Sequence, residues 1–282
     1  MPSRNTDGRP SRREVLSLTG GVVGSAIGVS GIAYAADRSF TDEDGDGIPD
    51  EKERSESFHR RLRGTFGDRF DGLDPDRRDL LIDARYVGET SVTDGTKTRI
   101  ESIFRDHGIF AQWLDHPVRY DRELVEERYG TTDQDILWTP DSFYHDVIED
   151  GLKDVALQVI VVPGRPEPPG KGRIYSPWIQ RAGPGPESGY VNGLSVGNRA
   201  VVTQQRDPET EAKLLLHEIA HLVLCHDDDP NNRGVMGTGA EFDLTAEEWE
   251  RLRDGLPRIR DSTGFDVGLR PCLWDEHLRT TF

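Results

Sequence analysis

Lysine is scarce in this sequence of 282 residues. Only five of the 35 basic side chains are lysines, whereas Asp and Glu number 52, and the formal net charge is −17. Such a charge argues against nucleic acid as a ligand, because phosphates demand a basic surface, and against docking on anionic lipid. Many acids with few lysines are typical of proteins from concentrated brine, where salt screens self-repulsion. We therefore expect a halophilic source, with an ordinary acidic protein as the alternative.

Cysteines and long apolar runs are also rare. The two cysteines, Cys225 and Cys272, leave two interpretations open, a single disulfide or two buried thiols. After residue 36 no stretch is apolar enough to cross a membrane. Hydrophobic residues make up 34% of the chain, which is enough for the core of one large or two modest domains.

The first 36 residues have the layout of an export signal. Arginines precede a mildly apolar stretch that ends in small residues at 33–36. The run SRREVL at 11–16 resembles a twin-arginine signal. We expect the twin-arginine export machinery to recognise residues 1–36 and a peptidase to remove them. The product would be secreted or placed at the cell surface without a membrane span. The alternative is a single membrane anchor over 15–35.

Residues 42–53 have the spacing of a calcium-binding loop. Carboxylates stand at positions 1, 3 and 5, glycine at position 6 and glutamate at position 12. Ca²⁺ takes six to eight hard oxygens, which alternate residues of a tight turn supply. The core DGDGIPD resembles the calcium repeats of thrombospondin type 3 and dockerin-like modules. The alternative is a solvated acidic linker. The expected ligands are Asp42, Asp44, Asp46, the carbonyl of Ile48, Asp50 and Glu53.

Composition divides the rest of the chain into two parts. Residues 37–77 are expected to contain the calcium loop, a short polar helix over 51–63 and a linker from 64 to 78, where Gly, Asp and Arg are frequent. Residues 78–282 are expected to form the main domain.

In the main domain, apolar runs alternate with helical periodicity, which predicts a mixed α/β (α+β) sheet. Seven prolines and seven glycines within 163–193 predict a long loop. A last helix opens with the capping box TAEE at 245–248, and Pro257 is expected to limit it. The predicted strands are 80–87, 110–118, 157–162 and 199–204, and the other predicted helices are 96–106, 141–150 and one that begins at Asp207-Pro208.

The residues that carry chemistry lie in the helix that begins at Asp207. It contains the run HEIAH, in which His217 and His221 are one turn apart on one face and can bind one Zn²⁺. Glu218 lies beside the first ligand and can act as general base toward a zinc-bound water. This five-residue pattern also arises by chance, and the histidines are then ordinary helix residues.

Together with the residues after it, this run resembles the metzincin zinc endopeptidases, in which HExxH is followed by a glycine, a third ligand and a turn bearing methionine. Met236 is the only methionine after the first residue and occupies the turn. The resemblance covers about 78–260. It implies a twisted mixed sheet above a cleft, the zinc helix as the floor, and a small C-terminal subdomain. It also implies that 199–204 flanks the cleft where a peptide adds as a strand.

One departure from the metzincin pattern leaves the third zinc ligand open. Leu224 stands at the glycine position. With the spacing of the metzincin pattern unchanged, the third ligand is Asp227. If this chain has one residue fewer between His221 and the third ligand, that ligand is His226. We favour His226, because imidazole is the usual third ligand, and place Cys225 last. In a continued helix His226 would lie about 140° from His221, so we expect the chain to leave the helix near Leu224.

The sequence thus predicts a secreted zinc-dependent endopeptidase with bound Ca²⁺ that acts on protein or peptide substrates. In this hypothesis a zinc-activated water attacks the scissile carbonyl, and Glu218 passes its proton to the leaving amine. One alternative is a non-catalytic secreted binding protein with a structural zinc, which a fourth protein ligand would favour. Another is a surface-anchored interaction module ordered by calcium, which a lack of zinc would favour.

Overall fold

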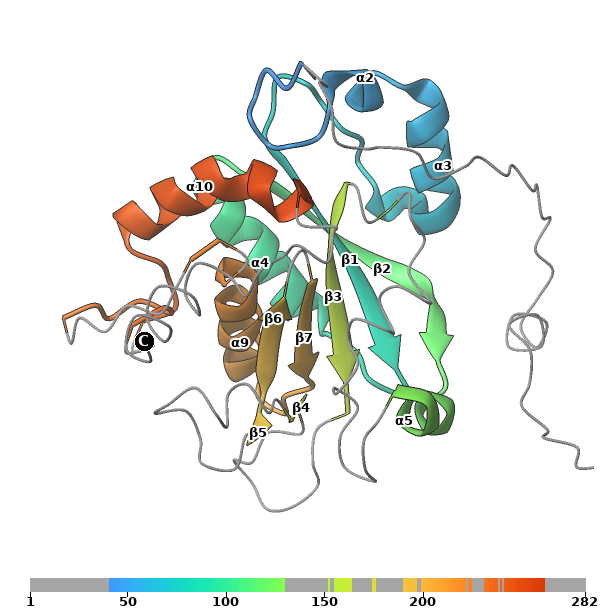
Figure 1. The fold of residues 1–282 in the computed structure, drawn as a ribbon, viewed down its shortest axis with the longest axis vertical. Helices are drawn as coiled ribbons and strands as arrows, with labels where there is room; N and C mark the ends of the chain where they lie inside the picture. The colour runs from blue at the N-terminus through green and yellow to red at the C-terminus, as the bar shows by residue number, and fades with distance from the viewer. Residues whose placement is uncertain are drawn as a thin grey trace, which may run out of the picture. The chain divides into compact units, whose positions relative to one another are not determined.

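The computed structural model (Figure 1) describes residues 41–129, 152, 155–163, 174–175, 190–196, 199–221, 223–224, 231–237, 239 and 241–261. Contacts divide the chain into residues 1–39 and a compact unit over 40–282, to which every element below belongs. Within the described ranges no helix has the length and apolar character needed to cross a membrane. The predicted signal over 1–36, the predicted helix over 141–150 and most of the predicted loop over 163–193 lie outside the described residues.

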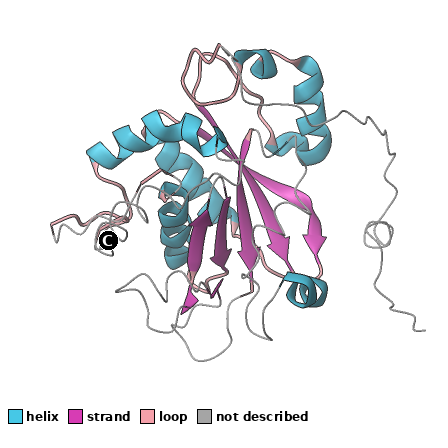
Figure 2. Ribbon diagram, in the orientation of Figure 1, coloured by secondary structure: helices cyan, strands magenta, loops and turns pink. Residues whose placement is uncertain are grey.

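A five-stranded mixed sheet forms the centre of this unit, and the predicted α/β fold is confirmed (Figure 2). The strands follow the order β2-β1-β3-β7-β6, and β6 alone among them runs antiparallel to its neighbour. Each predicted strand is found within two residues of its expected bounds. The strands are β1 (Asp79–Val87), β2 (Phe110–Tyr120), β3 (Ala156–Val162), β6 (Gly193–Val196) and β7 (Arg199–Thr203).

The position of β7 corrects one expectation. Residues 199–204 were expected to flank the cleft, but β7 is paired with β3 on one side and with β6 on the other. A strand with both sides paired has no backbone groups left for a peptide, so β6 is the edge strand at this end of the sheet. A separate pair joins β4 (Ile174–Tyr175) to β5 (Tyr190–Val191).

Three helices pack against one face of the sheet and enclose the larger core. They are α4 (Asp94–Asp106), α9 (Pro208–Ala220) and α10 (Ala246–Asp261), and a short helix, α5 (Arg122–Tyr129), follows β2. Alternate side chains of β1 point to this face, because side chains of a strand alternate between its two sides. Leu80, Ile82, Ala84 and Tyr86 therefore share a buried cluster with Leu215 and Leu252 of α9 and α10 and other apolar residues.

The segment from 64 to 78 is packed and is not the linker that its composition suggested. Phe66, Phe70 and Leu73 are buried in a second core together with Leu81 of β1 and other apolar residues. Gly, Asp and Arg surround these three side chains in the sequence. The average composition of the segment is therefore polar and does not indicate that the three are buried. The second core covers the other face of β1, and its burial ties the N-terminal segment to the sheet.

Local signals predicted the starts of α9 and α10, and the end of α4 at Asp106, but not the end of α10. The carboxylate of Asp207 accepts from the N–H of Thr210 at 2.8 Å, with Pro208 as the first helical residue of α9. The capping box of α10 forms, and Glu248 and Thr245 bond reciprocally at 2.7 and 3.3 Å. However, α10 continues through Pro257 to Asp261. A proline removes one backbone bond, and the buried residues Leu252 and Leu256 anchor the helix before it.

The single polar helix expected over 51–63 is two helices, α2 (Asp50–Glu53) and α3 (Glu56–Phe66). Ser55 separates them, and its hydroxyl accepts from the N–H of Phe58 to cap α3. A short 3-10 turn, Gly67–Arg69, follows α3.

Candidate metal centres

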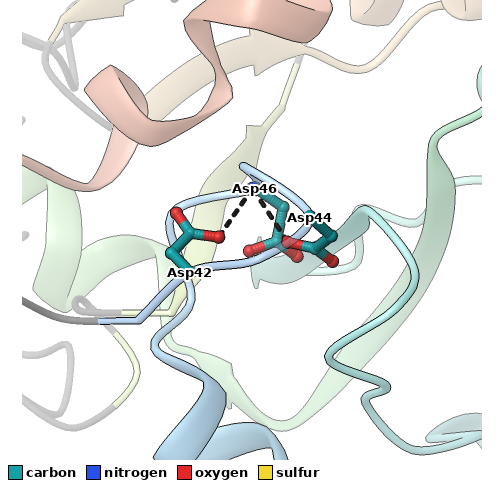
Figure 3. Close-up of side chains that lie close together, drawn as sticks. All are labelled: Asp42, Asp44 and Asp46. Atoms are coloured by element: carbon teal, nitrogen blue, oxygen red, sulfur yellow. Dashed lines mark hydrogen bonds between the residues drawn. The ribbon is translucent and has the colours of Figure 1, made fainter.

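The acidic loop folds through its own side chains (Figure 3). Oδ1 of Asp42 accepts from the N–H groups of Gly45 and Asp46 at 3.0 and 3.2 Å, and its Oδ2 accepts from Gly47 at 2.9 Å. Gly45 and Gly47 have φ angles of 73° and 87°, which residues with a Cβ rarely adopt. As a result, oxygens of Asp42, Asp44 and Asp46 lie within 4.8 Å of one another.

A second group of carboxylates shares Asp46 with this one. Asp46, Glu53 of α2 and Asp79 of β1 each contribute an oxygen, and the three oxygens lie within 4.8 Å of one another. All three residues are at most 2% exposed. Neither carboxylate oxygen of Glu53 has a hydrogen-bond partner among the residues that the structure describes.

Burial and mutual repulsion raise the pKa values of these carboxyl groups. Burial, followed by the charges of Asp46 and Asp44, raises the pKa of Glu53 to about 8. Burial and the charge of Asp46 raise the pKa of Asp44 to about 8. The pKa of Asp79 rises to about 6 through burial, which Arg77 partly opposes. Buried carboxylates grouped in this way fit a hard divalent cation, which supplies the missing positive charge.

The remaining predicted calcium ligands differ in their placement. Asp50 lies in neither group, because its Oδ1 accepts from the N–H of Glu43 at 3.1 Å and its Oδ2 pairs with Arg54 at 2.9 Å. Ile48 is fully buried, and its side chain belongs to the second core. Sequence reasoning missed Asp79, because it lies far outside the twelve-residue loop and no spacing rule connects it to that loop.

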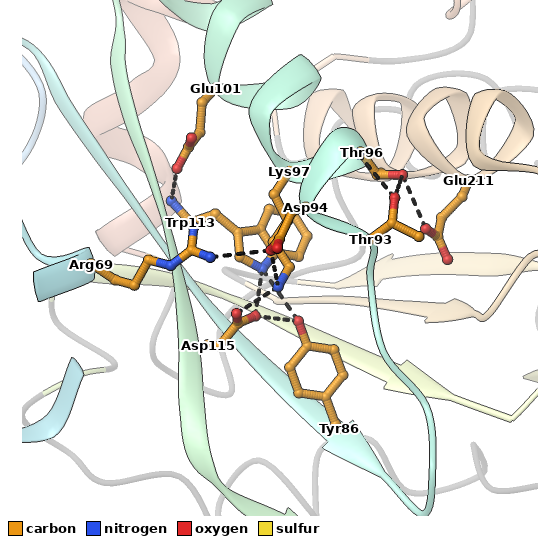
Figure 4. Close-up of polar contacts among 10 residues, drawn as sticks. All are labelled: Arg69, Tyr86, Thr93, Asp94, Thr96, Lys97, Glu101, Trp113, Asp115 and Glu211. Atoms are coloured by element: carbon orange, nitrogen blue, oxygen red, sulfur yellow. Dashed lines mark hydrogen bonds and ion pairs between the residues drawn. The ribbon is translucent and has the colours of Figure 1, made fainter. Parts of the chain in front are cut away.

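A polar network joins α4 to the sheet and to α9, the helix that carries the two histidines (Figure 4). Asp115 of β2 accepts from Lys97 at 2.6 Å, from the indole of Trp113 at 3.0 Å and from the hydroxyl of Tyr86. The hydroxyl of Thr96 donates to Glu211 at 3.2 Å and so holds the first part of α9 against α4. The helix that carries the histidines is thus fixed at its N-terminal end.

The two histidines lie at the other end of α9. His217 is in the last turn, and His221 follows the last residue and donates its backbone N–H to the carbonyl of His217 at 2.9 Å. The ring centroids are 4.4 Å apart, and the ring planes make an angle of 80°. This separation allows one ring nitrogen from each residue to reach a common ion.

Backbone carbonyls orient both rings. Nδ1 of His217 lies 2.9 Å from the carbonyl oxygen of Val235, and Nδ1 of His221 lies 3.2 Å from that of Leu224. Since a carbonyl only accepts, each Nδ1 carries a proton, and in the neutral ring Nε2 then has the lone pair. Metal-binding histidines are usually held in this way, so this pair of donors fits Zn²⁺.

The predicted methionine turn lies next to the first histidine. Val235, whose carbonyl accepts from His217, precedes Met236, which is fully buried in the larger core. Asn232 fixes the turn, because it donates to Glu248 of α10 at 2.9 Å and accepts from the N–H of Gly234 at 2.8 Å.

Glu218 lies against the edge strand β6. The hydroxyl of Ser195 lies 2.7 Å from Oε2 of Glu218 and 2.6 Å from its carbonyl oxygen. A Cβ at Gly193 would approach Oε1 of Glu218 to 2.2 Å, so only glycine allows this contact. Sequence reasoning missed Ser195 and Gly193, because they precede the helix by more than a strand and carry no motif.

The chain leaves α9 before His226, as expected, although it does so earlier than Leu224. The helix ends at Ala220, whose carbonyl accepts from the N–H groups of both Val223 and Leu224 at 2.9 and 2.8 Å. Gly255 of α10 packs here, since a Cβ at that position would lie 2.1 Å from Val223. His226, Asp227, Cys225 and Cys272 lie outside the described residues.

Comparison with known proteins finds likeness in structure but none in sequence. No protein-family model matches this sequence. No curated protein matches it either. The crystal structure of an archaemetzincin from Methanopyrus kandleri is similar at a TM-score of 0.44 and 18% identity, over 64% of this chain and 97% of that one. A likeness of this size does not bear on activity, and the case for zinc rests on the residues around α9.

Proposed function

We propose that this protein is a zinc-dependent peptidase, in which His217 and His221 are zinc ligands and Glu218 is the general base. The observation that carries this proposal is the orientation of the two rings. Carbonyls from two different segments, at Leu224 and Val235, both accept from Nδ1 and leave Nε2 of each ring as the ligand atom.

A third ligand belongs to this proposal, and we assign it to His226, with Asp227 as the alternative. Because α9 ends at Ala220, neither residue needs to follow the helical spacing that would place it away from the two histidines. Three protein ligands would leave one position for water or substrate, which catalysis requires.

The residues around Glu218 support its role as a base. Zinc bound here would polarise the scissile carbonyl and make a water more acidic. Glu218 takes the proton of the attacking water and passes it to the leaving amine. Ser195 and Gly193 hold the carboxylate against β6 and thereby reduce its freedom to turn away from the histidines.

The substrate class follows from the place of β6. It is the edge strand beside β7, and its residue Ser195 contacts Glu218. A peptide that extends along this edge would bring its backbone close to the base. We therefore propose protein or peptide substrates that bind in an extended conformation.

We further propose Ca²⁺ as the cation of the acidic loop, and export through the twin-arginine machinery to the outside of the cell or its surface. The carboxylates of Asp42, Asp44, Asp46 and Glu53 support the first proposal. The arginine pair and the small residues of 1–36 support the second. A protein exported into brine also accounts for the excess of acids and the scarcity of lysine.

The test combines elemental analysis with casein cleavage in high salt and Ca²⁺. We expect zinc in the wild type, and we expect Glu218→Ala to keep the metal while activity falls by about 10²–10⁴-fold. Glu209→Ala, which removes an exposed carboxylate from the same helix, is the control and should cleave like the wild type. Zinc without cleavage would favour the non-catalytic binding protein. Absence of zinc would reject the proposal.

A further inference from the structure

The starting observation is the burial of Glu53. Glu53 is only 2% exposed, and neither of its oxygens has a hydrogen-bond partner within the described part of the chain. Buried polar groups are nearly always partnered, and an ionised carboxylate left alone is costly. Glu53 is nevertheless grouped with two more carboxylates, Asp46 and Asp79, which makes its environment more negative.

Asp79 does not belong to the loop but begins β1, and the chain places it there through backbone contacts. Its N–H donates to Oδ2 of Asp46 at 2.7 Å. The neighbouring Arg78 donates through Nε to the carbonyl oxygen of Asp44 at 2.7 Å. The loop is thus bonded to the first residue of β1 and to the residue before it, and the carboxylate of Asp79 is held close to those of the loop.

The carboxylate of Asp79 accepts hydrogen bonds at both oxygens. Its Oδ1 accepts from Nε and Nη2 of Arg77 at 3.1 and 2.9 Å, and its Oδ2 accepts from the N–H of Asp74 at 2.9 Å. Arg77 contributes one positive charge against three carboxylates, and a divalent ion would compensate the remainder.

We infer that Asp79 is a cation ligand together with Asp46 and Glu53, so that bound Ca²⁺ joins the acidic loop to β1. This inference rests on the proposed Ca²⁺ and adds a ligand from outside the loop. The donors are carboxylate oxygens without sulfur or imidazole, which suits a hard cation, and their number suits Ca²⁺ better than Mg²⁺, which retains its waters.

The consequence is that Ca²⁺ stabilises the sheet and not only the loop. β1 pairs with β2 on one side and with β3 on the other, so it is an inner strand. Leu81, two residues after Asp79, packs in the same core as Ile48 of the loop. A ligand that binds only the folded chain raises its stability by mass action, and here the stabilised unit contains the inner strand.

Calorimetric titration of Ca²⁺ into the calcium-depleted full chain, at constant zinc and high salt, tests the inference. Asp79→Asn keeps a side-chain oxygen for Asp74 and should weaken Ca²⁺ binding by about ten- to a hundredfold. Asp76→Asn, an exposed carboxylate in the same segment, is the control and should bind like the wild type. Equal affinity of Asp79→Asn and the wild type would overturn the inference and leave Ca²⁺ in the loop. A wild type that binds no Ca²⁺ would overturn the calcium proposal itself.

Hydrogen exchange of the unmodified protein gives a second test that does not depend on a variant folding. We expect Ca²⁺ to slow amide exchange both in residues 42–53 and along β1, and to raise Tm by about 5–10 °C at a hundredfold excess over Kd. Protection confined to 42–53 would show that the cation does not reach the sheet, and the inference would be rejected. These readouts are independent of peptidase activity.

Discussion

The acidic loop and the end of α9 are both candidate metal centres, yet they are built in opposite ways. In the loop, side chains of 42–46 fold the turn that brings them together. At α9, the helix places two histidines, but the orientation of His217 depends on Val235 and the position of the Glu218 carboxylate depends on β6. A site formed within one short segment can be predicted from residue spacing. For a site held together by distant segments, the sequence shows the ligands but not the residues that orient them.

The largest expected effect is the loss of zinc, and it distinguishes the centre at α9 from the acidic loop. His221→Ala removes one of two donors on α9, and we expect zinc to be lost and cleavage to fall to background, because two remaining ligands hold zinc poorly. Calcium affinity should not change. Glu53→Gln is the reciprocal variant and should weaken calcium while zinc content stays constant. Retained zinc in His221→Ala would show that the pair is not a metal centre.

Removal of calcium should expose a pH dependence that belongs to the acidic loop alone. The pKa of folded Glu53, about 8, lies above its ordinary value, so the folded chain binds more protons than the unfolded one. The stability that Glu53 contributes without Ca²⁺ is therefore fully present below about pH 4.5 and is lost, by roughly 1–3 kcal/mol, as pH rises to about 8.

Denaturant titrations at several pH values, with and without Ca²⁺, measure this slope. Bound Ca²⁺ keeps the carboxylate ionised and should flatten the slope. Glu53→Gln in the calcium-free protein should reduce the slope without abolishing it, because Asp44, whose pKa is also about 8, still titrates in this range. A slope that is unchanged in Glu53→Gln would assign the whole effect to other carboxylates.

A smaller effect is expected where β6 contacts the base. Ser195→Ala removes a hydrogen bond of about 1–1.5 kcal/mol, so kcat should fall about tenfold while KM changes little. Ser195→Thr restores the hydroxyl and should recover most of the rate. Thr203→Val removes a hydroxyl from the adjacent strand without touching Glu218 and is the control. An unchanged kcat in Ser195→Ala would mean that the contact has no part in catalysis.

The smallest effect concerns the start of α9, far from the histidines. Asp207→Ala removes the cap on Thr210 and should lower stability by about 1 kcal/mol. Zinc content and kcat should be unaffected, since Glu211 still bonds Thr96 and holds this end of the helix. Loss of zinc in this variant would show that the whole helix, and not its last turn, determines the centre.

The sequence predicted the elements whose signals are local. Apolar runs gave the four longer strands, Asp207-Pro208 gave the start of α9, and TAEE gave the start of α10. The mixed α/β class followed from the order of these elements.

Features that depend on tertiary partners escaped prediction. Phe66 and Phe70 look like isolated aromatics in a polar linker until Leu81 is seen opposite them. Asp79 becomes part of the acidic group only when β1 begins beside the loop. Ser195 reaches Glu218 only because β6 folds back along β7. In each case the partner lies on another element, and no spacing rule connects the two.

The hydrogen bond between His217 and the carbonyl of Val235 also has a consequence for the protein during its synthesis. A chain grows from its N-terminus, and its early parts are available to fold before the later ones exist. The carboxylates of the loop and Asp79 are made before Val235, which follows Asp79 by 156 residues. Under the proposed function, a growing chain that has not reached Val235 lacks the partner that orients His217, so it remains inactive until this turn has been made.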